Sequence, residues 1–386
     1  MCDRIIAFAY LFEKNKGSEF QIGWELLEFP KTKNFFIAVP SFSFGSVPGK
    51  PRKISGLEFK IVNKKIIIKV DWGNFCPKTA MAMRAHFTMW IFFCFYILRD
   101  KSRMFWFVNL VQVAAFNPFF LFKSNKILVG PVGGQPKLYA QRIFNFRFRV
   151  RNFILTEVIY KFSPIRLVPR NRIIFIDKVL RNQFNLRSMI LPAITINDEH
   201  VLNFEKINKN DISQRDTIVC YTRDVGIKLP DLSFEVMKTL ATTMPDYKFV
   251  IMGANEDVVE NNFSSLQRVH QEDFFSILRG SRLNLVVSQE LAGFVQLEAV
   301  SSGCPNCYLN FIPDRNPLLV SNEAFNIKVS GYSKAKSVKE ATHFIKQLIL
   351  NESFLADELS KQKSKASQFT LSNKFSFIQK KMRELR

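Results

Sequence analysis

The stretch TIVCYTRDVGIKLPDLSFEVMKTLATTMPDYKFVIMG, residues 217–253, alternates two kinds of hydrophobic pattern. Residues 217–221 and 247–253 are short apolar runs, which predict buried strands. Between them Asp231 is the predicted cap of a helix. Apolar side chains recur along that helix at the spacing of one buried face, at Val236, Met237, Leu240 and Met244. A strand, a helix and a second strand at this spacing indicate a parallel βαβ unit.

The same alternation continues through the second half of the chain. EDFFSILRG, residues 272–280, predicts a helix, and LNLVVS, residues 283–288, predicts a strand. FVQLEAVSSG, residues 294–303, predicts a further helix. Ser337 and Glu340 have the spacing of a capping box at the start of another helix. This succession is typical of a doubly wound sheet, whose ligands bind beyond the carboxyl ends of the strands.

The first half shows similar but less regular signals. The stretch LEFKIVNKKIIIKVDW, residues 57–72, predicts either two strands or one long hairpin. Around residues 192–212 the chain becomes polar and irregular, which indicates a linker between domains. Other apolar runs predict strands at residues 4–12, 35–40, 126–134 and 172–177. We therefore expect an α/β protein with domains at residues 1–195 and 196–350 and C-terminal helices at residues 351–386.

The formal net charge of +22 is unevenly distributed. Residues 1–200 hold 31 Lys and Arg against 12 Asp and Glu, whereas residues 201–386 hold 24 against 21. Within the first half, residues 101–190 carry 16 basic side chains and two acidic ones, Glu157 and Asp177. This concentration of positive charge predicts that the region faces an anionic partner.

The six cysteines do not form a disulfide framework in a chain of 386 residues, and the first apolar run lacks the features of a secretory signal. A reducing cytosol fits best. Cys304 and Cys307 form a CxxC, but one pair cannot complete a tetrahedral zinc site, so coincidence is the better interpretation. The apolar run at residues 87–98 is too short for a bilayer core, which needs about twenty residues, and predicts a buried or interfacial segment.

Polar and glycine-containing loops follow several predicted strands. Arg223 and Lys228, five positions apart, follow residues 217–221 and lead into a helix, whereas Glu290 and Glu298 follow the strand at residues 283–288. Two further loops stand in the first half, KGSEFQIGW at residues 16–24 and VGPVGGQ at residues 129–135. Backbone amides in such loops suit phosphate or hydroxyl groups, and an Arg with a Lys can neutralise a diphosphate. Each feature alone is weak, and only their order along one chain points to a function.

In that order the sequence resembles the retaining, nucleotide-sugar-dependent glycosyltransferases of family 4, the bacterial polysaccharide and lipid-sugar transferases. Arg223 and Lys228 match the family's G-R-x-x-x-x-K loop, and Glu290 and Glu298 match its E-x-x-x-x-x-x-x-E motif. The two loops of the first half are similar to the G-S-E-x-x-x-G-W and G-P-x-G-G loops of one branch of the family. The resemblance implies the GT-B architecture, in which two Rossmann-like domains face each other across a cleft and C-terminal helices return to the first domain.

The resemblance also implies roles for individual residues. Arg223 and Lys228 would hold the donor's pyrophosphate, and Glu290 would lie beside the transferred sugar, so these three are the expected catalytic residues. Glu298 would bind ribose hydroxyls. The remaining expected donor-binding residues are Gly17, Gly133, Gly134, Gly293 and Phe294. No metal and no cofactor are expected, because the nucleotide-sugar is itself a substrate and no Asp-x-Asp is present.

The sequence also departs from the family pattern at several positions. Thr222 stands where the family has a glycine, and Leu291 and Ala292 replace a glycine and an aromatic residue after Glu290. No Gly-Gly phosphate loop follows Pro305. The family's acceptor-side histidine has no clear counterpart, and His86 is the candidate.

The segment RIFNFRFRVRNF, residues 142–153, interleaves arginines with aromatic residues. Such a pattern can bind single-stranded nucleic acid or anionic lipid headgroups. It can also be a solvent-exposed helix face without a binding function. Because no nucleic-acid-binding fold pattern accompanies it, a nucleic-acid partner is not expected. The expected acceptor or membrane contacts are Arg142, Arg147, Arg149 and Arg151.

Together these signals predict a glycosyltransferase at the cytoplasmic, inner face of the cell membrane. It would move a sugar from a UDP- or GDP-sugar to a lipid-linked or oligosaccharide acceptor, or to a growing surface polysaccharide, with retention of configuration. Two alternatives stay open. One is a nucleotide-sugar epimerase on the same fold, and the other is a catalytically impaired adaptor that binds membrane or nucleic acid.

Overall fold

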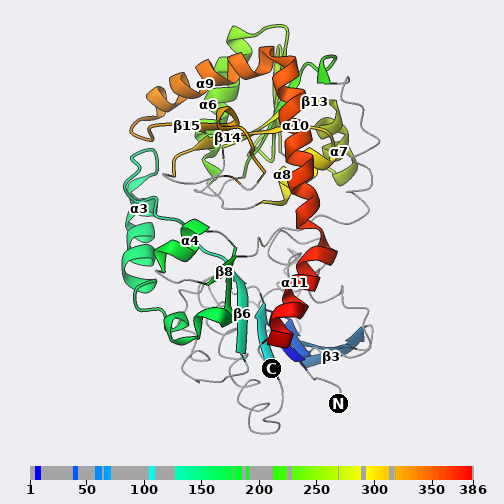
Figure 1. Ribbon diagram of the computed structural model, residues 1–386. Helices are drawn as coiled ribbons and strands as arrows, with labels where there is room; N and C mark the ends of the chain where they lie inside the picture. The colour runs from blue at the N-terminus through cyan, green and yellow to red at the C-terminus, as the bar shows by residue number, and fades with distance from the viewer. Residues whose placement is uncertain are drawn as a thin grey trace, which may run out of the picture. The chain divides into compact units, whose positions relative to one another are not determined.

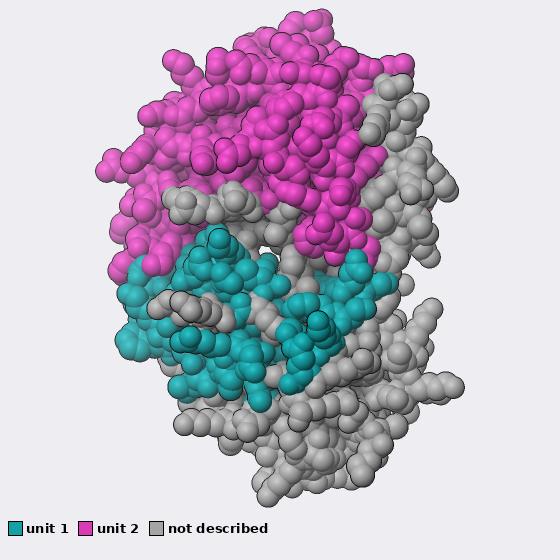
Figure 2. All heavy atoms as spheres, viewed as in Figure 1, with its two compact units in different colours: residues 1–134, 155–194, 371–386 teal, residues 135–154, 195–370 magenta. Residues whose placement is uncertain are grey.

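The computed structural model describes five strand segments in the first 126 residues and most of the chain from residue 127 to residue 384. The strand segments are residues 5–9, 38–41, 57–62, 65–70 and 104–108. The later part has gaps at residues 177, 185–187, 191–211, 224–227, 268, 288–292, 313–316 and 318. The chain divides into two compact units (Figures 1 and 2). Unit 1 comprises residues 1–134, 155–194 and 371–386, and unit 2 comprises residues 135–154 and 195–370.

Unit 1 is built on a parallel sheet of five strands in the order β1-β5-β6-β7-β8. These strands are β1 (Ile5–Ala9), β5 (Met104–Val108), β6 (Ile127–Val132), β7 (Ile173–Phe175) and β8 (Met189–Ile190). A smaller sheet contains β2 (Ala38–Ser41), β3 (Leu57–Val62) and β4 (Lys65–Val70). Strands β3 and β4 pair antiparallel, so residues 57–62 and 65–70 of the predicted stretch are two paired strands. The described helices of unit 1 include α4 (Lys178–Gln183) and α11 (Leu371–Glu384).

Unit 2 is built on a sheet of seven strands in the order β11-β12-β10-β9-β13-β14-β15. The strands are β9 (Thr217–Tyr221), β10 (Lys248–Met252), β11 (Val258–Glu260), β12 (Phe263–Leu266), β13 (Ser281–Val286), β14 (Asn306–Asn310) and β15 (Asn326–Lys328). Every neighbouring pair is parallel except β11 with β12. Its described α-helices are α3 (Phe146–Phe153), α6 (Pro230–Thr243), α7 (Gln271–Gly280), α8 (Phe294–Ser301), α9 (Lys334–Leu350) and α10 (Glu352–Ala366). The predicted α/β fold with parallel sheets is confirmed.

Strand β9 and helix α6 follow the sequence pattern closely, apart from the helix cap. β9 has the predicted bounds, and Val236, Met237 and Leu240 of α6 are fully buried. The predicted cap at Asp231 is wrong, because Leu229 is the residue that precedes the helix and Asp231 lies in its first turn. Pro230 accounts for the difference, since proline lacks a backbone N–H and is favoured at the first helical position.

Helix α9 also begins earlier than predicted. Its cap is Ser333, whose side-chain oxygen accepts a hydrogen bond from the Lys336 backbone N at 3.2 Å. The predicted capping box of Ser337 and Glu340 is therefore wrong. Ser337 is fully buried inside the helix, and the Glu340 carboxylate accepts from the Ser330 backbone N at 2.9 Å.

Residues 135–154 belong to unit 2, although the sequence analysis placed them in the first domain. Hydrogen bonds across more than 160 residues of chain explain this. The Gln141 side-chain amide donates to the Phe311 carbonyl oxygen at 3.0 Å, and the Ile143 backbone N donates to the Gly331 carbonyl oxygen at 3.0 Å. These bonds dock the segment on the loops that follow β14 and β15.

Helix α10 also belongs to unit 2, whereas α11 belongs to unit 1. The buried Glu358 of α10 holds the helix in place, because its carboxylate accepts from the backbone N of Ser321 at 2.8 Å and of Asn322 at 3.1 Å. One turn further on, Gln362 accepts from the Asn306 backbone N at 2.8 Å and donates to the Asn306 carbonyl oxygen at 2.9 Å. Buried polar groups in proteins are almost always paired in this way. The two C-terminal helices, predicted as one region at residues 351–386, are thus divided between the units.

Candidate functional site

Four neighbouring strands of unit 2 end at the same edge of the sheet. β9 pairs with β10 and β13, and β13 pairs with β14, all in parallel, so their carboxyl ends lie together. The segment after β9 carries Thr222, Arg223 and Lys228, and the segment after β13 leads into α8, which carries Glu298. Ligands of open parallel sheets bind beyond this edge. The described residues of the predicted donor site in unit 2 therefore all follow strand ends at one edge.

Arg223 and Lys228 lie around the ring of Tyr221, the last residue of β9. The Arg223 Nε donates a hydrogen bond to the Tyr221 hydroxyl, and its guanidinium carbon is 5.3 Å from the ring centroid. The Lys228 Nζ is 5.9 Å from the same centroid. Such contacts of a cation with an aromatic ring contribute about 0.5–1 kcal/mol at exposed sites. The structure thus brings the two predicted cations together, through a tyrosine that the sequence analysis assigned only to a buried strand.

The start of α6, directly after Lys228, has no side-chain cap. Leu229 has φ 46° and ψ 56°, a left-handed conformation that costs a residue with a side chain about 1–3 kcal/mol. Strain of this kind clusters at ligand-binding loops. The unpaired N–H groups and the positive dipole end of a helix favour an anion at its N-terminus. The Lys228 side chain is largely buried at this helix start, which adds a cationic group at the same place.

Thr222 continues β9 for one more residue and lies against the end of β10. Its backbone N donates to the Met252 carbonyl oxygen at 2.9 Å. A Cβ on Gly253, which has φ +78°, would lie 2.3 Å from the Thr222 carbonyl oxygen. Thr222 stands where the sequence resemblance predicts a glycine, and its buried hydroxyl makes no hydrogen bond in the described part of the structure. The close approach of the two strand ends holds the segment that begins with Arg223.

We predict that Gly253→Ala lowers the free energy of unfolding, by about 1–3 kcal/mol for the left-handed conformation alone. The clash with the Thr222 carbonyl oxygen adds to this cost. Gly280→Ala is the matched control, because a Cβ on Gly280 would meet no atom within 4 Å. Thermal unfolding of both variants checks the prediction. If Gly253→Ala unfolds at the temperature of Gly280→Ala, the described approach of β9 and β10 is wrong.

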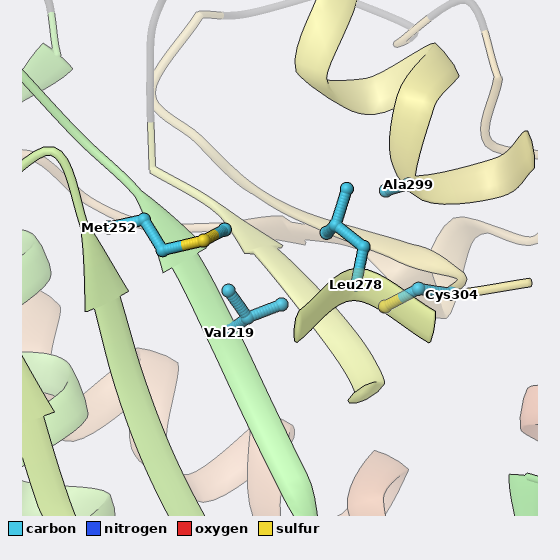
Figure 3. Close-up of a cluster of buried hydrophobic side chains, with 5 residues drawn as sticks. All are labelled: Val219, Met252, Leu278, Ala299 and Cys304. Carbon is cyan, nitrogen blue, oxygen red and sulfur yellow. The ribbon is translucent and has the colours of Figure 1, made fainter. Parts of the chain in front are cut away.

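Helix α8 is held on the sheet by a buried hydrophobic cluster (Figure 3). Ala299 of α8 and Cys304, which follows the helix, pack with Leu278 of α7. The other members, Val219 and Met252, come from the central strands β9 and β10, and the Tyr221 ring packs against the same cluster. Because Ala299 is fully buried, the orientation of α8 is fixed, and with it that of the half-buried neighbour Glu298. One core thus supports both Tyr221 and the helix that carries Glu298.

The start of α8 holds two predicted donor-binding residues, Gly293 and Phe294. Gly293 precedes the helix in an extended conformation, is buried, and provides no side-chain cap. A Cβ there would lie 2.5 Å from the Gln296 Oε1, so the glycine makes room for that side chain. Phe294 is the first helical residue and is half-buried. Glu290, expected beside the transferred sugar, lies outside the described residues, as do Gly17 and His86.

The glycine loop after β6 belongs to unit 1. A Cβ on Gly134 would lie 2.5 Å from the Tyr160 hydroxyl and 3.0 Å from the Leu180 Cδ1, so tight packing within unit 1 already requires a glycine there. Gly133, the other predicted donor contact in this loop, is half-buried. Both predicted roles stay predictions, and Gly134 has a packing function whether or not it contacts a donor.

Three of the four arginines predicted to contact an acceptor or membrane, Arg142, Arg147 and Arg151, are exposed. Arg149 is half-buried, and its Nε donates to the Tyr139 carbonyl oxygen at 2.8 Å. All four lie in unit 2 rather than in the first domain, where they were expected.

The described cysteines are part of the core. Cys220, Cys304 and Cys307 are fully buried free thiols. Burial raises the pKa of the Cys220 thiol to about 12, although Ser233 and the charge of Lys228 oppose the shift. Burial also raises the pKa of Cys304 and Cys307. Within the described ranges no group of three or more His, Cys, Asp or Glu side chains has a metal-binding arrangement.

Two α/β units, each with a parallel sheet, and a C-terminal helix assigned to the first unit are the elements of the GT-B fold, the fold of many nucleotide-sugar glycosyltransferases. Solved structures share this fold over nearly their whole length. One is an E. coli trehalose-6-phosphate structure with bound UDP-2-fluoro glucose, 10% identical, with a TM-score of 0.61 and 99% of each chain covered.

An α,α-trehalose-phosphate synthase (UDP-forming) from Burkholderia vietnamiensis is 10% identical, with a TM-score of 0.63, 100% of this chain and 97% of that chain covered. A sucrose-phosphate synthase from Thermosynechococcus elongatus is also 10% identical, with a TM-score of 0.62 and 99% of each chain covered. No protein-family model and no curated protein sequence matches the chain. At this identity the structural similarity establishes the fold alone, and the predicted GT-B fold class is confirmed.

Proposed function

We propose that this protein is a glycosyltransferase that takes a sugar from a UDP- or GDP-sugar and moves it to an acceptor with retention of configuration. The observation that carries the proposal is the pair Arg223 and Lys228 at Tyr221, beside the uncapped start of α6. This arrangement follows the end of a central strand of a parallel sheet, where ligands of such sheets bind. The GT-B fold, shared with enzymes that are named for making sugar phosphates, supports the same assignment.

The two cations would act on the leaving group. Breaking the bond between the sugar and the diphosphate leaves negative charge on the departing phosphate oxygen. Arg223, Lys228 and the N–H groups at the start of α6 would meet that charge without reorganisation. Groups placed in advance where charge develops stabilise a transition state more than a ground state. In this proposal the nucleotide-sugar is a substrate, and the reaction needs no further cofactor.

The helix α8 would hold the rest of the donor. A carboxylate can accept hydrogen bonds from two adjacent hydroxyl groups, which suits Glu298 to the 2′- and 3′-hydroxyls of a ribose. Gly293 and Phe294 would bring the first N–H groups of α8 toward the donor. Glu290 would lie beside the transferred sugar. Gly17, Gly133 and Gly134 would contribute contacts to the donor from the first domain.

The acceptor we propose is lipid-linked, or an oligosaccharide of a growing surface polysaccharide, used at the cytoplasmic face of the membrane. The support is the excess of basic residues, which suits an anionic surface or a lipid diphosphate. No helix in the described part of the chain has the length and apolar character needed to cross a bilayer. In this proposal the basic surface brings the enzyme to such an acceptor at the membrane surface.

We predict that purified protein releases nucleotide from its donor in an acceptor-dependent manner and that Glu298→Ala raises the donor KM about 100-fold. The magnitude follows from the loss of two hydrogen bonds to a charged group, each with a net contribution of about 1.5 kcal/mol at the lower end of the usual range. Glu235→Ala is the matched control, because Glu235 is a half-exposed helical glutamate of unit 2 whose only described ion pair is with Lys334.

Nucleotide release with membrane extracts or oligosaccharides as acceptors is the measurement. If the protein converts one nucleotide-sugar into another without any acceptor, it is an epimerase and the transferase proposal is wrong. Equal donor KM values for Glu298→Ala and Glu235→Ala would show that Glu298 does not bind the donor.

A further inference from the structure

The helix α3 exposes large apolar side chains to solvent. Phe146 is 75% exposed, Val150 41%, Phe153 47% and Ile154, at the end of the helix, 46%. Seven of the eleven large apolar side chains that are exposed in the described part of the protein fall within residues 146–167. Scattered exposed apolar residues are normal, but a concentration of them marks an interaction surface.

The opposite side of α3 is fixed to unit 2. Asn152 is fully buried, and its Oδ1 accepts from the backbone N of Leu138 at 2.7 Å and of Tyr139 at 3.0 Å. Its Nδ2 donates to the Pro136 carbonyl oxygen at 3.0 Å. The Asn145 side chain caps the helix by accepting from the Phe148 backbone N at 2.8 Å. The exposure of Phe146 and Val150 is therefore a property of an anchored helix.

The exposed apolar residues form one face of α3. At 3.6 residues per turn, Phe146, Val150 and Phe153 fall within an arc of about 60°. Arg147 and Arg151, each one position further along, fall on one flank of that arc and are exposed. The helix has no acidic residue in its first turn. We call Phe146, Arg147, Val150, Arg151 and Phe153 the α3 face.

We propose that the α3 face is an interfacial docking surface for an anionic lipid bilayer, with the apolar side chains entering the headgroup region and the two arginines contacting lipid phosphates. This deepens the proposed location at the membrane surface, but it does not depend on the donor site. Apolar side chains beside basic ones on one helix are the combination that binds anionic membranes, because binding strength increases with buried apolar area and with attraction to anionic lipids. The positive charge of the chain complements such a surface.

The test measures cosedimentation of the full chain with vesicles of phosphatidylcholine alone or with 30% phosphatidylglycerol, without nucleotide-sugar. The wild type should bind the anionic vesicles. Arg147→Gln with Arg151→Gln should weaken that binding about 25-fold, from about fivefold per basic residue. Phe146→Ser with Val150→Ser should weaken it at least tenfold, since membrane affinity scales with buried apolar area.

The controls are Phe344→Ser and the pair Lys336→Gln with Lys339→Gln, which change an exposed phenylalanine and two exposed lysines of α9. They should bind vesicles like the wild type. Arg149 is left unchanged, because its bond to the Tyr139 carbonyl oxygen holds the helix. A Phe146→Trp variant gives a direct readout, since brominated lipids should quench its added fluorescence.

Several results would overturn the proposal. They are equal binding of the wild type to neutral and anionic vesicles, wild-type binding by the serine pair, and absence of bromolipid quenching at residue 146. A single-stranded oligonucleotide bound through Phe146 would assign the face to nucleic acid. A dimer in light scattering that Phe146→Ser dissociates would assign it to a second copy of the chain. Nucleotide release in solution tests the donor site separately. Failure of the membrane proposal can therefore be distinguished from failure of the proposed transferase function.

Discussion

Replacement of both Arg223 and Lys228 by alanine should lower kcat/KM for the nucleotide-sugar by about 1,000-fold or more. Removing one hydrogen-bonding group that stabilises a transition state typically lowers the rate about 100- to 1,000-fold. This double change removes two such groups, both charged. The effect should fall mainly on kcat, because the charge on the leaving phosphate is largest when the sugar bond breaks. Steady-state kinetics with a donor and acceptor pair is the measurement.

Two further variants locate the effect. Lys238→Ala removes a half-exposed lysine of α6 that pairs with Glu260, and it should retain wild-type kinetics. Tyr221→Phe removes the hydroxyl that holds the Arg223 Nε but keeps the ring, so it should lower kcat by a smaller factor than the double variant. Wild-type kcat in the double variant would show that the segment after β9 does not stabilise the leaving group.

Arg282→Met should destabilise unit 2 by about 3–5 kcal/mol, because three carbonyl oxygens would lose their donor, at about 1 kcal/mol or more each. The Arg282 side chain is 2% exposed at the start of β13. Its Nε donates to the Ile349 carbonyl oxygen at 2.9 Å, and one terminal nitrogen donates to the Ile212 and Ser213 carbonyl oxygens at 3.1 and 3.2 Å. The other terminal nitrogen of Arg282 lies 3.2 Å from the Glu352 carboxylate.

Methionine preserves much of the volume of Arg282 but leaves these carbonyl groups without their donor, which is the expensive part of the change. Arg279→Met, an exposed position three residues earlier, should stay within about 0.5 kcal/mol of the wild type. In calorimetry the Arg282 variant should melt roughly 6–20 °C lower, from about 2–4 °C per kcal/mol in a unit of this size. If the Arg282 and Arg279 variants melt at the same temperature, the described hydrogen bonds of Arg282 do not stabilise unit 2.

The sequence predicted those elements whose hydrophobic period is clear. The strand at residues 217–221 and the buried face of α6 were found because alternation and helical spacing depend on neighbouring residues alone. Helix starts were harder, because they depend on backbone conformation. Leu229 precedes α6 in a left-handed conformation that the helix propensity of leucine does not indicate. Ser333 caps α9, although Ser337 and Glu340 match the capping-box pattern better.

The assignment of residues 135–154 to unit 2 could not be predicted locally. It rests on bonds from Gln141 and Ile143 to residues about 170 and 190 positions later in the chain. Tyr221 was overlooked as a site residue for a related reason. In the sequence it completes an apolar strand, and only the folded loop shows that Arg223 and Lys228 gather at its ring.

The central claim, that unit 2 binds a nucleotide-sugar at the segment after β9, is tested most directly by thermal unfolding with a panel of UDP- and GDP-sugars. A donor at about 100 times its Kd should stabilise the protein by about 2.7 kcal/mol. Unit 2 should then melt roughly 5–10 °C higher, and Arg223→Ala with Lys228→Ala should abolish the shift. No shift with any donor, or an equal shift in the double variant, would contradict the claim.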